Sequence, residues 1–483
     1  MKTRITALCF LLILGFQVLS QDHPLSGDQE FTSNTHLLES WIKAQMDYRG
    51  LPGMSLGIVY DQELVYARGF GYSDLEQKTP ATPQTIYRIA SITKTFTATA
   101  LMQLRDAGKL GLDDPITQYL PWFKIQNRHP DAPAITIRHL ITHTSGLPRE
   151  AAFPYWTDHK FPTREEMIAA LANQETIYAP ETEYKYSNLA LALAGEVVAA
   201  ASGMAYDQYI EKNILAPLGM TRSSVFLSAD EKRGLATPYS RRLDDGSHKV
   251  MPFTDSKGIA PAANMSSTVE DLARYLALQF REGPQGGSQI LKGSTLREMH
   301  RVHWLQPSWR SGRGLGFSVW QMDEHTVVGH GGWVAGNRTQ IAFIPKRKVG
   351  VIVLTNADDG DPWFYADKVL KMFLPVIAKL TAPETPVAQA NPAWQQYVGM
   401  YSDPWWFDTE VLIFNNKLMM NGYSFPPESD PAGELVELVP EGEHTFRMSG
   451  QNGNGELVVF EMDSQGKVTR VKVGENYIYP KAN

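Results

Sequence analysis

The chain has 483 residues, about three times the length of a typical domain, so it is too long to be one small module. Hydrophobic residues make up 43% and charged residues 20%, a balance that excludes a disordered chain. The 45 basic and 52 acidic side chains give a net charge of -7, which leaves no basic excess for nucleic-acid phosphates. We therefore expect a globular, mildly acidic protein with no nucleic-acid partner.

The first twenty residues are typical of a secretory signal peptide cleaved after Ser20. Lys2 and Arg4 precede an apolar run over 5–16, which is shorter than the roughly 20 residues of a membrane helix. Stable membrane insertion is not expected, and a retained N-terminal anchor is the alternative. The only cysteine, Cys9, lies in this run, so the mature chain would have no disulfide. We expect an exported protein, periplasmic or secreted.

Residues 381–392 contain three prolines and no hydrophobic periodicity, which is typical of a linker. We predict a signal peptide over 1–20, a large domain over 21–380, this linker, and a small domain over 393–483. Short segments of strand periodicity in the last of these predict a C-terminal antiparallel β-barrel.

The large domain carries both helical and strand periodicity. Ser267 and Glu270 form a capping-box pattern before a middle helix. Two strands at the start, three near the end and a helical insertion between them predict an α+β fold around one antiparallel sheet. The expected strands span 54–60, 63–71, 327–332, 339–345 and 349–356, and the expected helices span 32–47, 91–107, 164–172, 189–201, 268–280 and 362–380.

Ser91 and Lys94 begin a helix three residues apart, which puts both side chains on one face. A serine becomes a strong nucleophile only beside a base, and a buried lysine with a lowered pKa can be that base. The same spacing also occurs by chance in exposed helices. Here the following residues are mostly apolar, so the helix is expected to be buried and Lys94 to have a function.

Two further motifs could complete such a site. In Tyr186-Ser187-Asn188, the tyrosine could relay a proton and Asn188 could orient Lys94 or a substrate carbonyl, although an ordinary helix-capping turn has the same composition. In 329–333 (GHGGW), the glycines would let a substrate approach the backbone, and the N–H of Trp333 could donate to an oxyanion. A simple glycine-rich turn is the alternative there.

The order of these three motifs resembles the serine β-lactamase and penicillin-binding protein superfamily, and within it the class C β-lactamase-related group of esterases and D-aminopeptidases. The segments 104–115 and 135–148 extend the resemblance. It implies that Ser91 is acylated, that Lys94 and Tyr186 transfer protons, and that Asn188 positions the substrate. The N–H groups of Ser91 and Trp333 would form the oxyanion hole, with Gly332 beside it.

Two departures from the family pattern stand out. Penicillin-recognising relatives usually carry Lys-Thr-Gly where this chain has His330-Gly331-Gly332, so a neutral imidazole would face the substrate carboxylate. We therefore expect poor penicillin hydrolysis, unless His330 merely packs beneath the pocket. The segment Ala262-Ala263-Asn264 replaces a glycine pair that relatives often have, which could alter the pocket wall.

Other candidates carry less chemistry. His139 and His143 have the spacing of a zinc pair but no third ligand, so a core or hydrogen-bonding role is expected, with no metal or cofactor. The aromatic run 405–407 could bind carbohydrate or pack against a neighbouring domain.

The leading hypothesis is an exported serine hydrolase that forms an acyl-enzyme with a small-molecule or peptide substrate, an ester or an amide. The alternative is a non-catalytic binder of peptidoglycan or peptides with the same fold. The sequence does not indicate the oligomeric state.

Overall fold

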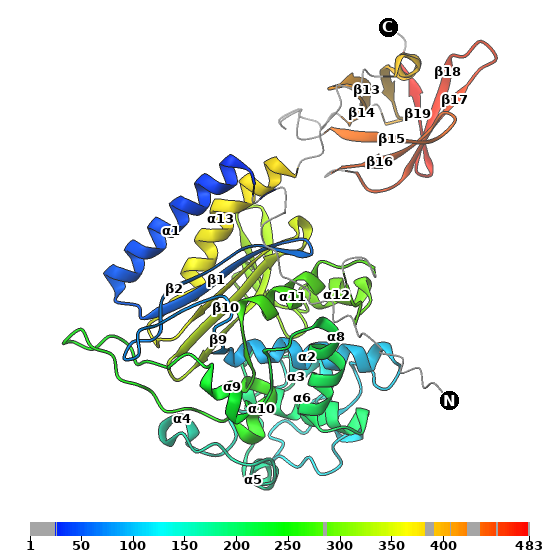
Figure 1. The fold of residues 1–483 in the computed structure, drawn as a ribbon. Coiled ribbons are helices and arrows are strands. Elements are labelled where there is room, and N and C mark those ends of the chain that lie inside the picture. The colour runs from blue at the N-terminus through cyan, green and yellow to red at the C-terminus, as the bar shows by residue number, and fades with distance from the viewer. Residues whose placement is uncertain are drawn as a thin grey trace, which may run out of the picture. The chain divides into compact units, whose positions relative to one another are not determined.

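The computed structural model describes residues 25, 27–283, 287–381, 391–405, 407–422, 435–450 and 453–481. The chain forms two compact units, one ending at Thr381 and the other beginning at residue 382 (Figure 1). The expected signal peptide over 1–20 with Cys9, most of the expected linker over 381–392, and Trp406 lie outside the described residues.

The first unit contains a nine-stranded sheet in the order β3-β2-β1-β11-β10-β9-β8-β7-β6. Because β1 pairs antiparallel with β11, the two ends of the unit complete one sheet, which confirms the predicted α+β fold. The short strands β3, β6, β7 and β8 were not anticipated. The strands are β1 Gly53–Tyr60, β2 Glu63–Asp74, β3 Thr79–Pro80, β6 Trp304–Leu305, β7 Ser311–Arg313, β8 Ser318–Met322, β9 His325–Val334, β10 Asn337–Ile344 and β11 Val349–Thr355.

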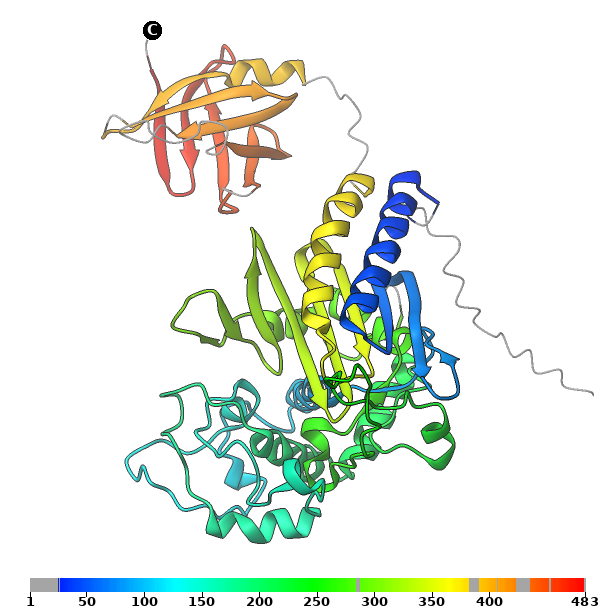
Figure 2. The ribbon, with the colours of Figure 1, turned by 90° about the vertical axis from the view of Figure 1, so that its left-hand side faces the viewer.

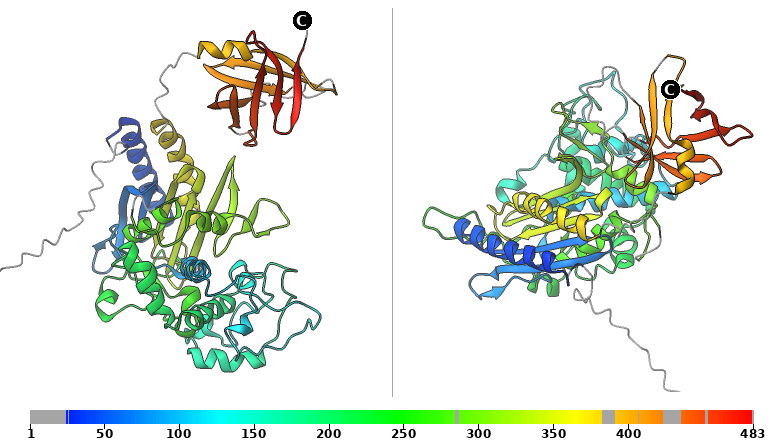
Figure 3. Two further views of the ribbon diagram at one scale, coloured as in Figure 1. Left: turned by 90° about the vertical axis from the view of Figure 1, so that its right-hand side faces the viewer. Right: turned by 90° about the horizontal axis from the view of Figure 1, so that it is seen from above.

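Two long helices, α1 (Gln29–Arg49) and α13 (Pro362–Leu380), cover one face of this sheet. They lie side by side in Figures 2 and 3, where α1 is blue and α13 is yellow. Phe31 of α1 and Phe373 of α13 meet edge to face with ring centroids 5.3 Å apart. Their apolar faces and the sheet share one core.

The inserted helical region packs on the opposite face of the sheet. Its central helices, α2 (Thr93–Asp106) and α6 (Asn188–Ser202), contact each other, and most of their residues are buried. The helix α11 (Val269–Gln279) is capped by Thr268, whose side chain accepts from the N–H of Asp271, so the predicted capping box at Ser267 is wrong by one residue. The shorter helices are α3 Ile137–Thr142, α4 Tyr155–Asp158, α5 Arg164–Ala170, α7 Tyr206–Ile210, α8 Ala216–Leu218, α9 Ala229–Arg233, α10 Ala260–Ala263 and α12 Gly293–His300.

Within the described ranges, no single helix has the length and apolar composition to cross a membrane. One pair, Asn188–Ser202 with Tyr206–Leu218, meets both conditions together but is bent by 74°.

The second unit is a closed antiparallel barrel, as predicted. The barrel's apolar interior includes Val411, Val458 and Phe460. Its first and last strands, β12 and β19, were not anticipated. The barrel strands are β12 Gly399–Ser402, β13 Asp408–Phe414, β14 Lys417–Gly422, β15 Val436–Gly442, β16 Thr445–Ser449, β17 Leu457–Met462, β18 Val468–Val473 and β19 Asn476–Pro480.

Candidate active site

Ser91 lies in a short 3-10 turn, Ala90–Ile92, directly before α2. The α-helix expected over 91–107 therefore begins at Thr93, after this turn. Ala90 has φ of 47°, in the left-handed region that residues other than glycine seldom adopt. Such strain persists only where the surroundings impose it, and here it sets the direction of the turn that carries Ser91.

Lys94 lies one turn further on and is completely buried. Its Nζ is 3.0 Å from Ser91 Oγ, 2.8 Å from Asn188 Oδ1 and 2.8 Å from the carbonyl oxygen of Ala262. Burial lowers the pKa of Lys94 well below its usual value, because an ammonium group loses its hydration there. A neutral amine can donate its two hydrogens to the two carbonyl-type oxygens, and its lone pair then faces Ser91.

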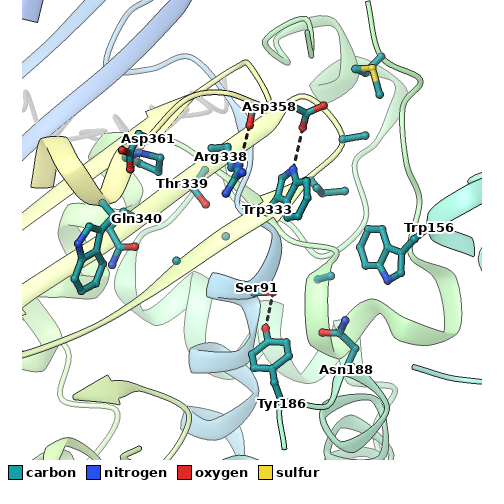
Figure 4. Close-up of a pocket in the computed structure, with 18 of the residues that line it drawn as sticks. Ser91, Trp156, Tyr186, Asn188, Trp333, Arg338, Thr339, Gln340, Asp358 and Asp361 are labelled. Carbon is teal, nitrogen blue, oxygen red and sulfur yellow. Dashed lines mark hydrogen bonds between the residues drawn. The ribbon is translucent and has the colours of Figure 1, made fainter. Parts of the chain in front are cut away.

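Tyr186 contacts Ser91 from the other side. Its hydroxyl donates to Ser91 Oγ at 2.9 Å (Figure 4). Burial raises the pKa of Tyr186 to about 12, although the hydrogen bond to Ser91 opposes the shift. The phenol is therefore protonated at neutral pH. These pKa directions favour a neutral Lys94, and not a Tyr186 phenolate, as the base that takes the proton of Ser91.

Glu150 is a member of this cluster that sequence reasoning missed. Asn188 opens α6, and its Nδ2 donates to Oε1 and Oε2 of Glu150 at 2.9 Å and 3.1 Å. Arg149 Nε lies 3.1 Å from Glu150 Oε1, and the Tyr155 hydroxyl donates to Oε2. The only sequence signal was position, since Glu150 closely follows the family-like segment 135–148.

His143 packs against the segment that carries Tyr186 and Ser187. Among the described residues it belongs to no cluster that could bind a metal ion. Its Nδ1 accepts from the N–H of Ser187 at 3.2 Å, and its ring lies 4.4 Å from the Tyr186 ring. Burial lowers its pKa well below the usual value, so the imidazole is neutral. The Nδ1 of His139 accepts from the N–H of Thr136 at 3.1 Å, which completes the capping box at the start of α3, and its Nε2 lies 3.2 Å from Glu181 Oε1. The expected hydrogen-bonding roles of both histidines are confirmed.

Strand β9 presents a free edge to the site. β8 pairs with β9 only as far as Gly329, so within the described residues 330–334 have a partner strand, β10, on one side only. A Cβ on Gly332 would lie 2.2 Å from the carbonyl oxygen of Ile89, so only glycine fits there. Trp333 is 59% exposed, and its Nε1 donates to Asp358 Oδ1 at 2.9 Å.

His330, which the sequence predicts to contact substrate, is buried and is not among the residues that line the pocket. Side chains alternate along β9, so Gly331 and Trp333 face outward while His330 points into the interior. It is 6% exposed, and its Nδ1 donates to the carbonyl oxygen of Gly331 at 2.7 Å. Burial lowers its pKa to about 3. The argument for poor penicillin hydrolysis loses this basis, because His330 lies beneath the site.

These groups surround a pocket of about 750 Å³. In Figure 4 Tyr186 and Asn188 lie on one side of it, and Trp333 and Trp156 lie across from them. Ala263, from the segment 262–264 that stands where relatives often have a glycine pair, contributes to the wall. The permanent cations on the wall are Arg149 and Arg338. Arg338 Cζ lies 4.3 Å from the centre of the Trp333 ring, and its Nε donates to the carbonyl oxygen of Asp358 at 3.0 Å.

Curated relatives match most of the chain. Beta-lactamase-like protein 2 of Dictyostelium discoideum is 29% identical over 383 residues, 77% of this chain and 69% of that protein. Penicillin-binding protein 4* of Bacillus subtilis is 25% identical over 453 residues, 85% of this chain and 93% of that protein. Protein flp of Staphylococcus aureus is 27% identical over 66% of this chain, and the match spans only 62% of its own length.

Solved structures share the fold. The octameric penicillin-binding protein homologue from Pyrococcus abyssi is 28% identical, with a TM-score of 0.62 over 92% of this chain and 100% of that chain. EstCE1, a hydrolase with promiscuous acyltransferase activity, is 23% identical, with a TM-score of 0.62 over 71% of this chain and 99% of its own. A D-stereospecific amidohydrolase from Streptomyces sp. is also 23% identical, with a TM-score of 0.58 over 70% of this chain and 98% of its own.

A sequence profile of the Beta-lactamase family matches residues 38–371, which include the whole Ser91 site. The profile covers more than half of the chain, and the penicillin-binding protein relatives agree with it. The chain therefore belongs to the Beta-lactamase family, in the serine β-lactamase and penicillin-binding protein superfamily of hydrolases.

Proposed function

We propose that this protein is an exported serine hydrolase that cleaves an ester or amide through an acyl-enzyme on Ser91. The observation that supports this most is the contact of Ser91 Oγ with two proton-transfer groups, Lys94 Nζ at 3.0 Å and the Tyr186 hydroxyl at 2.9 Å. Burial moves the two pKa values in opposite senses, so one group is ready to accept a proton and the other to donate one.

In the proposed acylation step, neutral Lys94 takes the proton of the Ser91 hydroxyl as Oγ attacks the substrate carbonyl carbon. The carbonyl oxygen becomes an oxyanion, which accepts from the main-chain N–H groups of Ser91 and Trp333. When the tetrahedral intermediate collapses, Tyr186 donates its proton to the leaving oxygen or nitrogen and recovers one from Lys94. Water then hydrolyses the acyl group through the same proton transfers.

The pocket supports a substrate with a bulky apolar part. Trp156, Trp333 and Trp363 line it, and a volume of about 750 Å³ exceeds what a short acyl group needs. The free edge of β9 suits a substrate with amide groups, so a D-amino-acid peptidase activity and an esterase activity are both compatible with the site. Export to the periplasm or medium follows from the signal-peptide pattern of residues 1–20.

Turnover of a panel of esters, D-amino-acid amides and penicillins tests the proposal. The wild type should hydrolyse at least one member, and Ser91→Ala should lose that activity while keeping its circular dichroism spectrum and melting temperature. A binding protein with no catalysis would retain equal ligand affinity in both forms and show no turnover in either.

A further inference from the structure

We infer that Glu150 is a positioning residue that locks the Asn188 amide in the one orientation that lets Lys94 act on Ser91. The inference rests on the proposed function and adds to it a residue that none of the three motifs contains. Glu150 touches neither Ser91 nor Lys94, and it does not line the pocket, so its action passes through Asn188 and through its charge.

The lock follows from hydrogen-bond polarity. A carboxylate only accepts, so its two oxygens, 2.9 Å and 3.1 Å from Asn188 Nδ2, require the amide NH₂ on that side. Asn188 Oδ1 must then face Lys94, where it lies 2.8 Å from Nζ. A flipped amide would point its NH₂ group at Nζ and compete with the Ser91 hydroxyl for the lysine lone pair.

Glu150 is itself held from several directions. The Tyr155 hydroxyl donates to Oε2, Arg149 Nε lies 3.1 Å from Oε1, and Gln174 Nε2 donates to the main-chain oxygen at 2.9 Å. The side chain is 19% exposed. Charge-assisted hydrogen bonds of this kind are short and strong, so the carboxylate has one preferred position.

The charges around Lys94 shift its pKa, which is an effect that packing of uncharged groups alone would not produce. The negative charge of Glu150 raises the pKa of Lys94, and the positive charge of Arg149 lowers it, both within the larger lowering by burial. Tyr186, His143 and His330 also surround the amine, but their shifted pKa values keep them neutral near pH 7. Neighbouring residues 149 and 150 therefore act on Lys94 in opposite directions.

Three variants separate charge from orientation. In Glu150→Gln the negative charge is lost, so the acidic limb of kcat/KM should move to lower pH by on the order of one unit. In Arg149→Gln, the matched control, the limb should move to higher pH. In Glu150→Asp the charge stays but the shorter side chain loses contact with Asn188, so kcat should fall roughly tenfold with the limb nearly unmoved.

The same shifts can be measured without turnover. NMR titration of ¹⁵N-labelled lysine side chains, with the Lys94 signal assigned through Lys94→Arg, should show the opposite displacements in Glu150→Gln and Arg149→Gln. If Glu150→Gln and Arg149→Gln had the same acidic limb and the same Lys94 titration as the wild type, and Glu150→Asp had the wild-type kcat, the role of Glu150 would be overturned. An enzyme that shows these titration shifts but turns nothing over, with or without Ser91, would instead refute the proposed function.

Discussion

Replacing Tyr186 with phenylalanine tests the division of labour at Ser91. The change removes only the hydroxyl that lies 2.9 Å from Ser91 Oγ, while the ring can keep its packing at 4.4 Å from His143. A positioned proton donor contributes roughly 10²–10⁴-fold, about 3–5.5 kcal/mol of barrier. We expect kcat/KM for an alkyl ester or amide to fall within that range.

The leaving group makes this prediction specific. An alkoxide or amine anion leaves only with a proton, whereas p-nitrophenolate leaves without one, so Tyr186→Phe should impair p-nitrophenyl ester hydrolysis much less. Because burial raises the pKa of Tyr186 to about 12, the wild-type rate should rise with pH through the lowered pKa of Lys94 and then stay level in mildly alkaline solution. The Tyr186→Phe variant should keep the same acidic limb of the pH profile, and its rate on the plateau should be lower.

Tyr184→Phe is the matched control, since Tyr184 lines the same pocket and its hydroxyl makes no hydrogen bond with any described residue. Its rates should stay within a few-fold of wild type. Equal losses for alkyl and p-nitrophenyl esters in Tyr186→Phe, or equal losses in both tyrosine variants, would refute the assignment of Tyr186 as proton donor.

Two further predictions concern Arg338 in the pocket wall and the buried His330. Arg338 stacks on Trp333, and its terminal nitrogens make no hydrogen bond with a described residue, so they can bind a substrate carboxylate. The kcat/KM for succinate monoesters should therefore exceed that for matched neutral esters, and Arg338→Gln should cut this preference roughly tenfold. An unchanged ratio of the two kcat/KM values in the variant would contradict the prediction. Because burial lowers the pKa of His330 to about 3, the unfolded chain binds more protons than the folded chain between this value and the ordinary pKa of 6.5, so stability is lost as the pH is lowered from 6.5 towards 3. His330→Asn should reduce the slope of this loss by up to about 1.4 kcal/mol per pH unit, and equal slopes for wild type and variant in chemical denaturation would refute the assignment.

The sequence contained enough to anticipate the reacting cluster. Ser91 and Lys94 lie one helical turn apart, which is local geometry, and the apolar residues after them required burial of the lysine. The antiparallel sheet followed from strands at both ends of the domain, which meet where β1 pairs with β11.

Features that depend on tertiary contacts or on strand register could not be read in advance. Glu150 lies in no motif, and its role appears only once Asn188 is folded against it. The burial of His330 near Lys94, beneath the pocket, depends on how β9 packs against the helical region, which local sequence does not reveal. The cap of α11 fell on Thr268 rather than Ser267, since two adjacent hydroxyl residues are equally suited by composition.

The most direct test of the central claim is intact-mass spectrometry of the protein quenched during turnover of an activated ester. The account predicts one added acyl mass, which peptide mapping places on Ser91, and no such adduct in Ser91→Ala. An adduct on another residue, or undiminished turnover by the alanine variant, would contradict it.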